Sequence, residues 1–427
     1  MTTSRRTGAP TTQRMFAAHG PGLVEHHQRF GPLPESAGTA LVPVLDRSGL
    51  TGRGGAGFPA GRKIASVTGR RAVVIGNGAE GEPLSHKDAE LLSRAPHLVL
   101  DGLKVAAAAV SAEKVVLYVP FRAVPTIKAA ISERSSAKLD RHRVTVVAAP
   151  DRFVAGQESA VVRRVEGGPA LPRDQTVPPS TSGVRGRPTL VNNVETLAHI
   201  ALIARYGSRW FRSLGDPSEP GTMLVTLSGG PTLSGGPTPH SVLEVPTGTR
   251  LTDLVGHLGV TDLRALRAVL VGGYHGSWIP REMVTGARLS RAGLAHLGAS
   301  PGAGIIHALP ADQCGLARTA DILGYLAGES ARQCGPCRNG LPQLARLFDD
   351  LAYRRVDDRL LDEVRRMIDL IDGRGSCRHP DGTARLARSA LDAFASDITH
   401  HRYGRCEATL TSVYGTGRPR HHTSGSR

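Results

Sequence analysis

Short apolar runs alternate with amphipathic stretches over the first half of the chain. Three apolar runs, Arg71–Gly76, Lys114–Pro120 and Arg143–Ala149, have the length and composition of buried strands. The stretches between them have a helical period. The first, residues 88–110, is expected to form two helices, because Pro96 interrupts it and proline lacks the N–H that a helix interior needs. Strands that alternate with helices predict an α/β fold with a parallel sheet and with ligands at the carboxyl ends of the strands.

The second half of the chain changes its pattern twice. Residues 222–284 contain short apolar runs, one short helix and glycine turns, which predict a small strand-rich module. The hexapeptide L-S-G-G-P-T occurs twice in succession within residues 227–238, and we expect this duplication to lengthen a hairpin loop. From Leu316 onward the period is helical, with apolar stripes over residues 341–351 and 356–371. This last part is predicted to form a small helical bundle.

Length and composition define the class of protein. The chain has 427 residues, enough for about two to four domains, and its 40% hydrophobic and 21% charged residues are typical of a globular protein. No apolar run approaches the roughly 20 residues that span a bilayer. Residues 1–35 show little periodicity and no apolar core of a secretory signal, so we expect a loose N-terminal extension. A cytoplasmic location is expected.

The net charge of +16 bears on the class of partner, and the count of five cysteines bears on disulfide bonding. Arginine is spread along the chain, and no nucleic-acid motif accompanies it, so the charge favours an acidic protein partner over nucleic acid. A zinc-bearing nucleic-acid binder is a weaker alternative that only the charge supports. An odd number of cysteines in a large chain without a signal argues against a disulfide framework.

The most distinctive stretch is Ser48–Lys63, which reads S-G-L-T-G-R-G-G-A-G-F-P-A-G-R-K. Glycine carries no Cβ and adopts positive φ without strain, so this backbone can lie close to a flat or anionic ligand. Successive N–H groups can form an anion site, to which Arg53 and Lys63 add positive charge. The sequence therefore predicts a site for a phosphate-bearing cofactor. The alternative is a flexible glycine loop with no ligand.

The segment G-R-G-G-A-G-F-P-x-G-x-K resembles the flavin loop of the family of the NADH-binding 51-kDa subunit of respiratory complex I. Relatives of that family include the diaphorase subunits of NAD-linked hydrogenases and formate dehydrogenases. Further matches follow in the same order, from about Pro43 to about Ser396. The resemblance implies an α/β fold with a glycine-rich FMN loop and a Rossmann-like parallel sheet, followed by a β-grasp module like the family's SLBB domain and a C-terminal helical bundle.

The expected division of the chain has five parts. A loose extension (1–35) precedes an FMN- and dinucleotide-binding α/β domain (36–213), a β-grasp SLBB-like domain (214–303), a helical iron–sulfur-binding domain (304–400) and a basic flexible tail (401–427). A small thioredoxin-like iron–sulfur domain is not seen within the chain. The resemblance therefore implies a separate partner of that kind.

Two further segments resemble parts of the family's flavin and nicotinamide cavity. Residues 77–88 read N-G-A-E-G-E-P-L-S-H-K-D, in which Asn77 is suited to bind the flavin, and Glu80 and Glu82 are the predicted catalytic carboxylates that accept hydrogen bonds from the nucleotide. The family's aspartate is replaced here by alanine. Residues 153–160 retain Glu158 as a further cavity residue. The alternative for the glutamates is a solvated turn, since most carboxylates are exposed.

The segment G-R-P-T-L-V-N-N-V-E-T at residues 186–196 is the most specific match to the family. Asn192, Asn193 and Thr196 are polar groups at a predicted helix start, which suits them to hold the flavin phosphate. A purely structural role, with Asn193 as the N-cap, is compatible with this function. Taken together, the predicted cofactor-binding residues are Gly52, Arg53, Gly54, Gly55, Phe58, Lys63, Asn77, Glu80, Glu158, Asn192, Asn193 and Thr196.

Two aromatic positions that sandwich adenine in the family are changed. Phe58 is retained, but the positions of two other rings correspond to Ser66 and Ser180. Losing two rings at about 1 kcal/mol of stacking each would weaken nucleotide binding by roughly one to two orders of magnitude. Flavin binding is therefore better supported than the use of NADH as the donor.

Residues 329–340 read E-S-A-R-Q-C-G-P-C-R-N-G and resemble the family's E-S-C-G-x-C-x-P-C-R-x-G. Family thiolates at these positions, with a fourth that corresponds to Cys377, hold a [4Fe–4S] cluster. The resemblance thus implies Cys334, Cys337 and Cys377 as metal ligands, while the first ligand position is Ala331. Cys314 is an alternative source of the missing thiol.

Three outcomes stay open at this cysteine site. A [4Fe–4S] cluster with a non-cysteine or exogenous fourth ligand is one. A [3Fe–4S] cluster, or zinc with His379 as the fourth ligand, is another. The third is a vacant site whose cysteines pack as small apolar residues. We expect the remaining cysteine, Cys406, to be a free thiol in the basic tail.

The resemblance implies a flavoprotein oxidoreductase subunit with NADH dehydrogenase activity. FMN would take a hydride from NAD(H), and single electrons would pass through the iron–sulfur centre to a partner. The expected partners are a small thioredoxin-like iron–sulfur subunit or a ferredoxin, and other subunits of a redox complex at the inner face of the cell membrane. The alternatives are an electron-transfer subunit that uses ferredoxin or NADPH, and a degenerate scaffold subunit without redox turnover.

Overall fold

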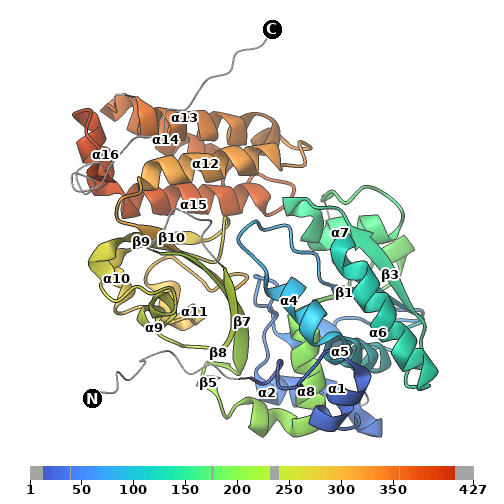
Figure 1. Cartoon of the computed structure of the whole chain (residues 1–427). Coiled ribbons are helices and arrows are strands. Elements are labelled where there is room, and N and C mark those ends of the chain that lie inside the picture. The colour runs from blue at the N-terminus through green and yellow to red at the C-terminus, as the bar shows by residue number, and fades with distance from the viewer. Residues whose placement is uncertain (1–12, 39, 175–176, 231–239, 355, 409–427) are drawn as a thin grey trace, which may run out of the picture.

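The computed structural model describes residues 13–38, 40–174, 177–230, 240–354 and 356–408. These residues form three regions: an α/β region, a second sheet with short helices, and a layer of helices near the C-terminus (Figure 1). No helix among the described residues combines the length and the apolar character that a membrane crossing requires.

The α/β region is built on a four-stranded parallel sheet with the order β3-β2-β1-β4. β1 pairs with both β2 and β4, so that Ile75 lies opposite Val116 on one side and Val191 on the other. The predicted parallel α/β sheet is confirmed, although the sequence did not indicate β4, whose apolar run is short. The strands are β1 (Val73–Asn77), β2 (Lys114–Pro120), β3 (Val144–Ala149) and β4 (Thr189–Asn193).

Five helices connect or follow these strands. Pro96 begins a new helix, as predicted, because proline is tolerated in the first turn of a helix but not in its interior. α5 and α8 pack closely: a side chain at Gly102 would lie 1.9 Å from the carbonyl oxygen of Leu197. Only glycine permits this approach of the two backbones. The helices are α4 (Lys87–Arg94), α5 (Pro96–Ala109), α6 (Val124–Ser136), α7 (Glu158–Val165) and α8 (Val194–Phe211).

The N-terminal segment packs against the α/β region. The prediction of a loose extension is wrong for residues 13–35, because Met15 and Phe30 are buried in the core and the segment includes α1. The backbone N–H groups of Arg14 and Met15 both donate to the carboxylate of Glu244, each at 2.8 Å. Residues 1–12 lie outside the described part. The helices of this segment and of the stretch that follows it are α1 (Leu23–Phe30), α2 (Leu41–Ser48) and α3 (Ala60–Ala65).

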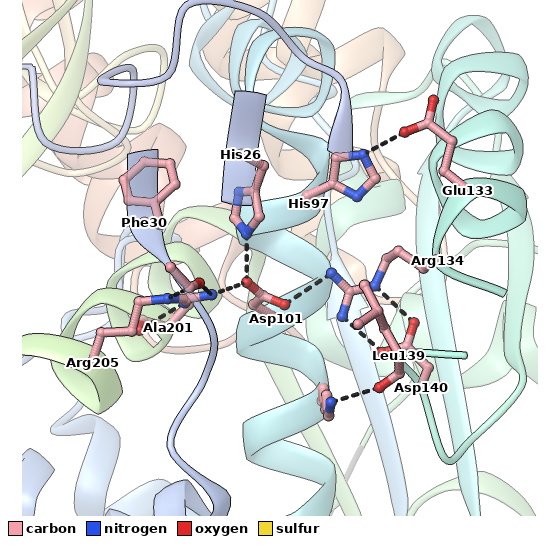
Figure 2. Close-up of polar contacts among 12 residues, drawn as sticks. His26, Phe30, His97, Asp101, Glu133, Arg134, Leu139, Asp140, Ala201 and Arg205 are labelled. Atoms are coloured by element: carbon pink, nitrogen blue, oxygen red, sulfur yellow. Dashed lines mark hydrogen bonds and ion pairs between the residues drawn. The ribbon is translucent and has the colours of Figure 1, made fainter. Parts of the chain in front are cut away.

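A buried ionic cluster holds α1 in place (Figure 2). Asp101 on α5 contacts Nε2 of His26 at 2.7 Å and Nη1 of Arg134 at 2.8 Å, and Arg205 on α8 donates to the same carboxylate. Although burial opposes it, the hydrogen bond from His26 and the charges of both arginines lower the pKa of Asp101. One carboxylate thus joins α1, α5, α6 and α8.

The second sheet has five strands in the order β10-β9-β11-β7-β8. β11 and β7 are parallel, and the other neighbours are antiparallel. The second copy of the hexapeptide, residues 233–238, lies outside the described part, and so does the expected hairpin loop at residues 231–239. The elements are β7 (Thr222–Gly229), β8 (Ser241–Pro246), β9 (Leu266–Val271), β10 (Ser277–Pro280), β11 (Ile305–Pro310), α9 (Leu251–Gly256), α10 (Arg281–Val284) and α11 (Arg291–Ala295), with a short hairpin, β5 (Gly215–Asp216) and β6 (Glu219–Pro220), before them.

The C-terminal region is helical, as its period predicts. Leu341, Leu344 and Leu351 lie on one buried face of α13. The prediction of a flexible tail from residue 401 is wrong for residues 401–408, because His401 is buried and belongs to α16; residues 409–427 lie outside the described part. The helices are α12 (Gly315–Gly328), α13 (Leu341–Tyr353), α14 (Asp358–Ile371), α15 (His379–Ala393) and α16 (Ala395–Arg402).

The buried carboxyl of Glu244 predicts a pH-dependent stability. Burial raises its pKa from 4.5 to about 7, so the folded state binds a proton that the unfolded chain releases between these values. The free energy of unfolding should therefore fall as pH rises from about 4.5 to 7, by up to about 3 kcal/mol from this group. We expect Glu244→Gln to remove this part of the slope in urea unfolding followed at several pH values. Parallel curves for the two proteins would contradict the assignment.

Candidate functional site

The glycine loop joins α2 to α3 and is closed at its base. The N–H of Gly52 donates to the carbonyl of Phe58, and that of Ala60 donates to the carbonyl of Leu50, both at 2.9 Å. The N–H of Arg53 donates to Oγ1 of Thr196 at 2.9 Å. This bond ties the loop to the first turn of α8, so two segments that the sequence indicated separately meet in one place.

The side chain of Arg53 is turned into the protein. It is 5% exposed, and its guanidinium lies 3.3 Å from the carbonyl oxygen of Pro220 and 3.6 Å from Oε1 of Glu219. Burial lowers the pKa of Arg53, which the charges of Glu195 and Glu219 oppose. Arg53 therefore joins the loop to β6.

A second arginine reaches the loop from α11, and no sequence pattern indicated it. Nη2 of Arg291 donates to the carbonyl of Gly55 at 3.2 Å, and its Nε lies 3.6 Å from Glu219. Gly57 has φ +64°, and a side chain there would overlap the Arg291 guanidinium. Arg291 lies 236 residues from Gly55, so no local pattern could have revealed the contact.

The carboxyl end of β1 leads into the acidic segment, residues 77–88. Asn77 is braced on both sides, since its Nδ2 donates to the carbonyl of Gly156 at 2.8 Å and its Oδ1 accepts from the N–H of Ala79 at 3.1 Å. Glu80 accepts hydrogen bonds from Oγ of Ser85 and from the backbone N–H groups of Asp88 and Ala89. Its carboxylate thus caps the first turn of α4, a role that the sequence did not suggest.

Glu82 lies at the contact between this segment and the second sheet. Its Oε2 accepts from the N–H of Tyr274 at 2.9 Å. Gly273 has φ +82°, and a side chain there would come within 2.7 Å of the same oxygen. Burial raises the pKa of Glu82 to about 7, against the two backbone hydrogen bonds that favour its charged form. Glu82 is therefore a carboxyl that titrates near neutral pH.

A buried group of charges lies beneath this segment. Nζ of Lys87 contacts Oδ1 of Asp88 at 2.7 Å and Oε2 of Glu195 at 2.9 Å, and all three side chains are almost fully buried. Glu195 also accepts from the N–H of Leu224 on β7 at 2.8 Å. Burial opposes ionisation of Lys87, but the charges of Asp88 and Glu195 raise its pKa. This cluster connects α4, α8 and the second sheet.

The polar residues at the end of β4 have different environments. Asn193 is the N-cap of α8, because its Oδ1 accepts from the N–H of Glu195, and its Nδ2 donates to Asp88 at 2.7 Å. Asn192, in contrast, is buried, and its Nδ2 has no hydrogen-bond partner within the described part of the chain. A buried donor without a partner costs roughly 1–3 kcal/mol, so Asn192 is suited to bind a ligand.

The remaining predicted residues have exposed or partly exposed side chains. Lys63 pairs with Glu158 at 2.9 Å, and both side chains are partly exposed. Phe58 is 53% exposed, and none of the ring contacts found among the described residues includes it. Ser66 donates to the carbonyl of Lys63, so no second ring stands at this position.

The residues present fit a flat, anionic cofactor. A side chain at Gly52 or Gly55 would find no atom closer than 3.6 Å, so the loop has open space beside its backbone. Asn192 offers a spare donor, and Arg291 and Lys63 supply positive charge near the loop. These are features of a phosphate-bearing ligand site.

The structure brings the three predicted metal-binding cysteines together. Cys334, Cys337 and Cys377 line one small pocket, to which Ala331 also contributes. Cys337 lies in the π-helical turn Pro336–Gly340 that leads into α13. Burial and the neighbouring Cys334 and Cys377 thiols raise the pKa of Cys337 to about 12. These three cysteines can supply three thiolate ligands to an iron–sulfur cluster. Ala331 has no side-chain donor, so it offers no fourth ligand.

Two expectations about the cysteine site are wrong. His379 is not available as a zinc ligand, because its Nε2 contacts the carbonyl of Leu326 at 2.9 Å and its Nδ1 contacts His275 at 3.0 Å. Cys314 does not approach the three cysteines, since it precedes α12 whereas they lie beyond the other end of that helix. The expectation that Cys406 is a free thiol is confirmed, and this thiol is hydrogen-bonded to Cys314 and His401.

Comparison with known sequence families gives two matches along the chain. Residues 45–202 match the Nuo51 FMN-binding domain, and residues 317–401 match the NADH-ubiquinone oxidoreductase-F iron-sulfur binding region. The first match contains the glycine loop, the acidic segment and the first turn of α8. The second contains all three cysteines of the pocket.

Whole proteins with similar sequences include two quinone-linked subunits and one from a hydrogenase. One NADH-quinone oxidoreductase subunit, of Rhizobium meliloti (strain 1021), is 29% identical over 84% of this chain and 88% of that protein. The corresponding NADH-quinone oxidoreductase subunit of Streptomyces coelicolor is also 29% identical, over 86% and 83%. The HndC subunit of the NADP-reducing hydrogenase of Solidesulfovibrio fructosivorans is 28% identical over 84% and 76%.

A solved structure shares the fold. The chain superposes on a crystal structure of NAD+-reducing [NiFe]-hydrogenase in the H2-reduced state with a TM-score of 0.76 and 29% identity. The match covers 85% of this chain, and the chain spans about 62% of the length of that solved chain.

The buried charge cluster predicts a large difference between two lysines. Lys87→Met should lower the free energy of unfolding by about 3–5 kcal/mol, because it removes the cation that contacts both buried carboxylates, Glu195 and Asp88. Lys63→Met, which breaks a partly exposed pair, should cost less than about 1 kcal/mol. Urea unfolding measures both values. Similar small losses for the two variants would refute a structural role of the buried cluster.

Proposed function

The chain is a divergent member of the family of the NADH-binding 51-kDa subunit of complex I, and we propose that it is the electron-input subunit of a redox complex. In this role it is an enzyme that oxidises a nicotinamide dinucleotide with FMN and passes electrons to a partner. The observation that carries the proposal is the closed glycine loop, which the N–H of Arg53 ties to Thr196, four residues after Asn192 with its spare donor. Both segments lie within the FMN-binding match.

FMN, when bound, supplies the chemistry of hydride acceptance and one-electron release. We infer that the backbone of Gly52 and Gly55 holds it from one side, since these glycines leave room for close approach, whereas the space beside Gly54 is occupied by Asn193. The Nδ2 of Asn192 would donate to it. Arg291 takes the charge-balancing role that the sequence analysis assigned to Arg53, because its side chain lies against the loop and is 37% exposed, whereas that of Arg53 is buried.

The two predicted catalytic carboxylates, Glu80 and Glu82, have different roles in this proposal. Glu80 already accepts three hydrogen bonds, so we infer that it positions the acidic segment. Glu82 has spare acceptor capacity and a pKa of about 7, so it can hold or release a proton at its carboxyl at neutral pH. Glu82 is therefore the better candidate to contact the nucleotide.

We infer that Cys334, Cys337 and Cys377 hold the iron–sulfur cluster through three thiolates. The fourth iron would take a ligand that is not a cysteine, because Ala331 stands at that position. Arg173 lines the same pocket, and its positive charge favours a negatively charged cluster there. Its guanidinium is held by Glu166 at 2.5 Å.

The same proposal includes the other regions and the partners. We take the second sheet to be a β-grasp of the SLBB kind, and α12–α16 to be the iron–sulfur-binding bundle, with boundaries near residues 36, 214, 304 and 400. The relatives are named as subunits of a quinone-linked oxidoreductase and of a hydrogenase. Other redox subunits are therefore the expected partners, among them a small iron–sulfur subunit or a ferredoxin, at the inner face of the membrane.

The absence of two aromatic rings that would stack on adenine leads to a second candidate for the electron donor. Phe58 stands alone where adenine would stack, since Ser66 and Ser180 replace rings. NADPH or reduced ferredoxin is therefore an alternative to NADH as the source of electrons. A scaffold without turnover is the remaining alternative, and cofactor content separates it from both.

The visible spectrum of the anaerobically purified chain tests the proposal. We expect a flavin spectrum, iron and sulfide in the amounts of one cluster, and bleaching of the flavin on addition of NADH. Flavin that responds only to NADPH or reduced ferredoxin would favour the second donor. A colourless protein that cannot be reconstituted with FMN would leave only the scaffold.

Two adjacent asparagines provide a matched test of the flavin site. Asn192→Asp replaces the spare donor by a carboxylate, so FMN affinity should fall by about tenfold or more. Asn193→Asp keeps the N-cap oxygen but sets a carboxylate against Asp88, so it should lower the free energy of unfolding by about 1–3 kcal/mol. Fluorescence titration with FMN and urea unfolding measure the two effects. Unchanged FMN affinity in Asn192→Asp would remove Asn192 from the site.

A further inference from the structure

A second group of sulfur and nitrogen donors lies away from the three-cysteine pocket. Sγ of Cys314, Nε2 of His401 and Sγ of Cys406 all lie within 4.8 Å of one another. The Cys314 sulfur is 3.7 Å from Nε2 of His401, and Cys406 is hydrogen-bonded to both residues. Two thiols and one imidazole form a donor set that zinc prefers among the common metal ions.

The surrounding structure orients these donors toward one another. Nδ1 of His401 contacts the carbonyl oxygen of Leu351 at 2.9 Å, and a carbonyl can only accept. The ring proton is therefore on Nδ1, and Nε2 presents its lone pair to the two thiols. A second hydrogen bond of this kind is typical of histidines that bind metals. Cys314 is the N-cap residue of α12, so its position is fixed by the start of that helix.

A buried carboxylate accompanies the group. Asp397 precedes His401 by one turn of α16, so both side chains lie on the same face of that helix. Asp397 is buried, and neither of its oxygens has a hydrogen-bond partner among the described residues. The nearby cation is Arg267, at 3.7 Å from Asp397, and it also pairs with Glu407. Glu407 also contacts Nδ1 of His400 at 2.9 Å. Two carboxylates share one guanidinium, and two thiols that lose their protons on binding would add negative charge, which favours a divalent cation.

We propose that Cys314, His401 and Cys406 supply three of the four ligands of a zinc site. The site is separate from the three-cysteine pocket, because Cys314 lies at the N-terminus of α12 and the pocket lies beyond its C-terminus. The 14 residues of that helix correspond to about 21 Å. Zinc here joins the start of α12, the end of α16 and the segment that follows α16.

The proposed metal would anchor residues 403–408. Residues 403–406 lie outside helices and strands, and Arg405 among them is exposed. Of the three ligands, Cys406 belongs to this segment, whereas Cys314 and His401 belong to the ends of α12 and α16. Loss of zinc should therefore release Arg405 to trypsin while α12 and the rest of α16 keep their packing.

Zinc binding to full-length variants tests the proposal without interference from the other site. In a background with Cys334→Ser and Cys377→Ser, the chelator-treated, reduced chain should bind one zinc in competition with a fluorescent indicator. Adding Cys406→Ser or His401→Ala should weaken zinc binding by at least about tenfold. Cobalt should give the visible bands of a tetrahedral thiolate site in the background protein and lose them with Cys406→Ser. Far-UV circular dichroism checks that each variant is folded.

Two results would overturn the proposal. One is zinc binding that requires Cys334 and Cys377, so that the background protein, which lacks both cysteines, binds no zinc. The other is a disulfide-linked peptide containing Cys314 and Cys406 in protein purified without oxygen, together with no zinc. Trypsin supplies an independent readout, since cleavage after Arg405 should become faster on zinc removal in the background protein. An unchanged cleavage rate would exclude a role of the metal in anchoring this segment.

Discussion

The buried contact of Lys87 with Asp88 and Glu195 is the constraint on which the two sheets depend. Three charges without access to water are tolerated only when each is paired, so α4 and α8 are held in one relative position. Glu195 also accepts from the backbone of Leu224, which extends the constraint to β7. The acidic segment and the end of β4 lie directly on this cluster, because Asn193 donates to Asp88. The residues of the proposed flavin site are thus held in position by this buried ionic cluster.

The glycine loop takes its position from the same framework. Its N–H at Arg53 is bound by Thr196 in the first turn of α8, immediately after Glu195. Glu219 then lies between the guanidinium groups of Arg53 and Arg291, at 3.6 Å from each. Arg53 joins the loop to β6 through the carbonyl of Pro220, and Arg291 lies against the loop backbone at Gly55. The charge offered to a ligand therefore depends on how the second sheet docks against the α/β region.

The departures from the family pattern are unevenly distributed. The glycine loop and the end of β4 keep the family's residues, and the acidic segment lacks one carboxylate of the pattern, at Ala79. By contrast, Ala331 stands at one position of the cysteine pattern, and Ser66 and Ser180 stand at two ring positions. Flavin binding and electron delivery are thus separable in this chain. At the other end of α12, Cys314, His401 and Cys406 offer a donor set that is independent of both. The helical region therefore contains two sulfur sites with different donor chemistry.

The sequence by itself determined the elements and the local chemistry. Apolar runs located β1, β2 and β3, Pro96 separated α4 from α5, and the glycine run and the cysteine spacing marked two sites, because these signals depend on neighbouring residues. Only the tertiary structure decided which side chains remain available to a ligand. Glu80 is used as a helix cap, Arg53 is turned inward, and Arg291 comes from 236 residues away. Such contacts depend on how separate elements pack, and no periodicity along the chain encodes them.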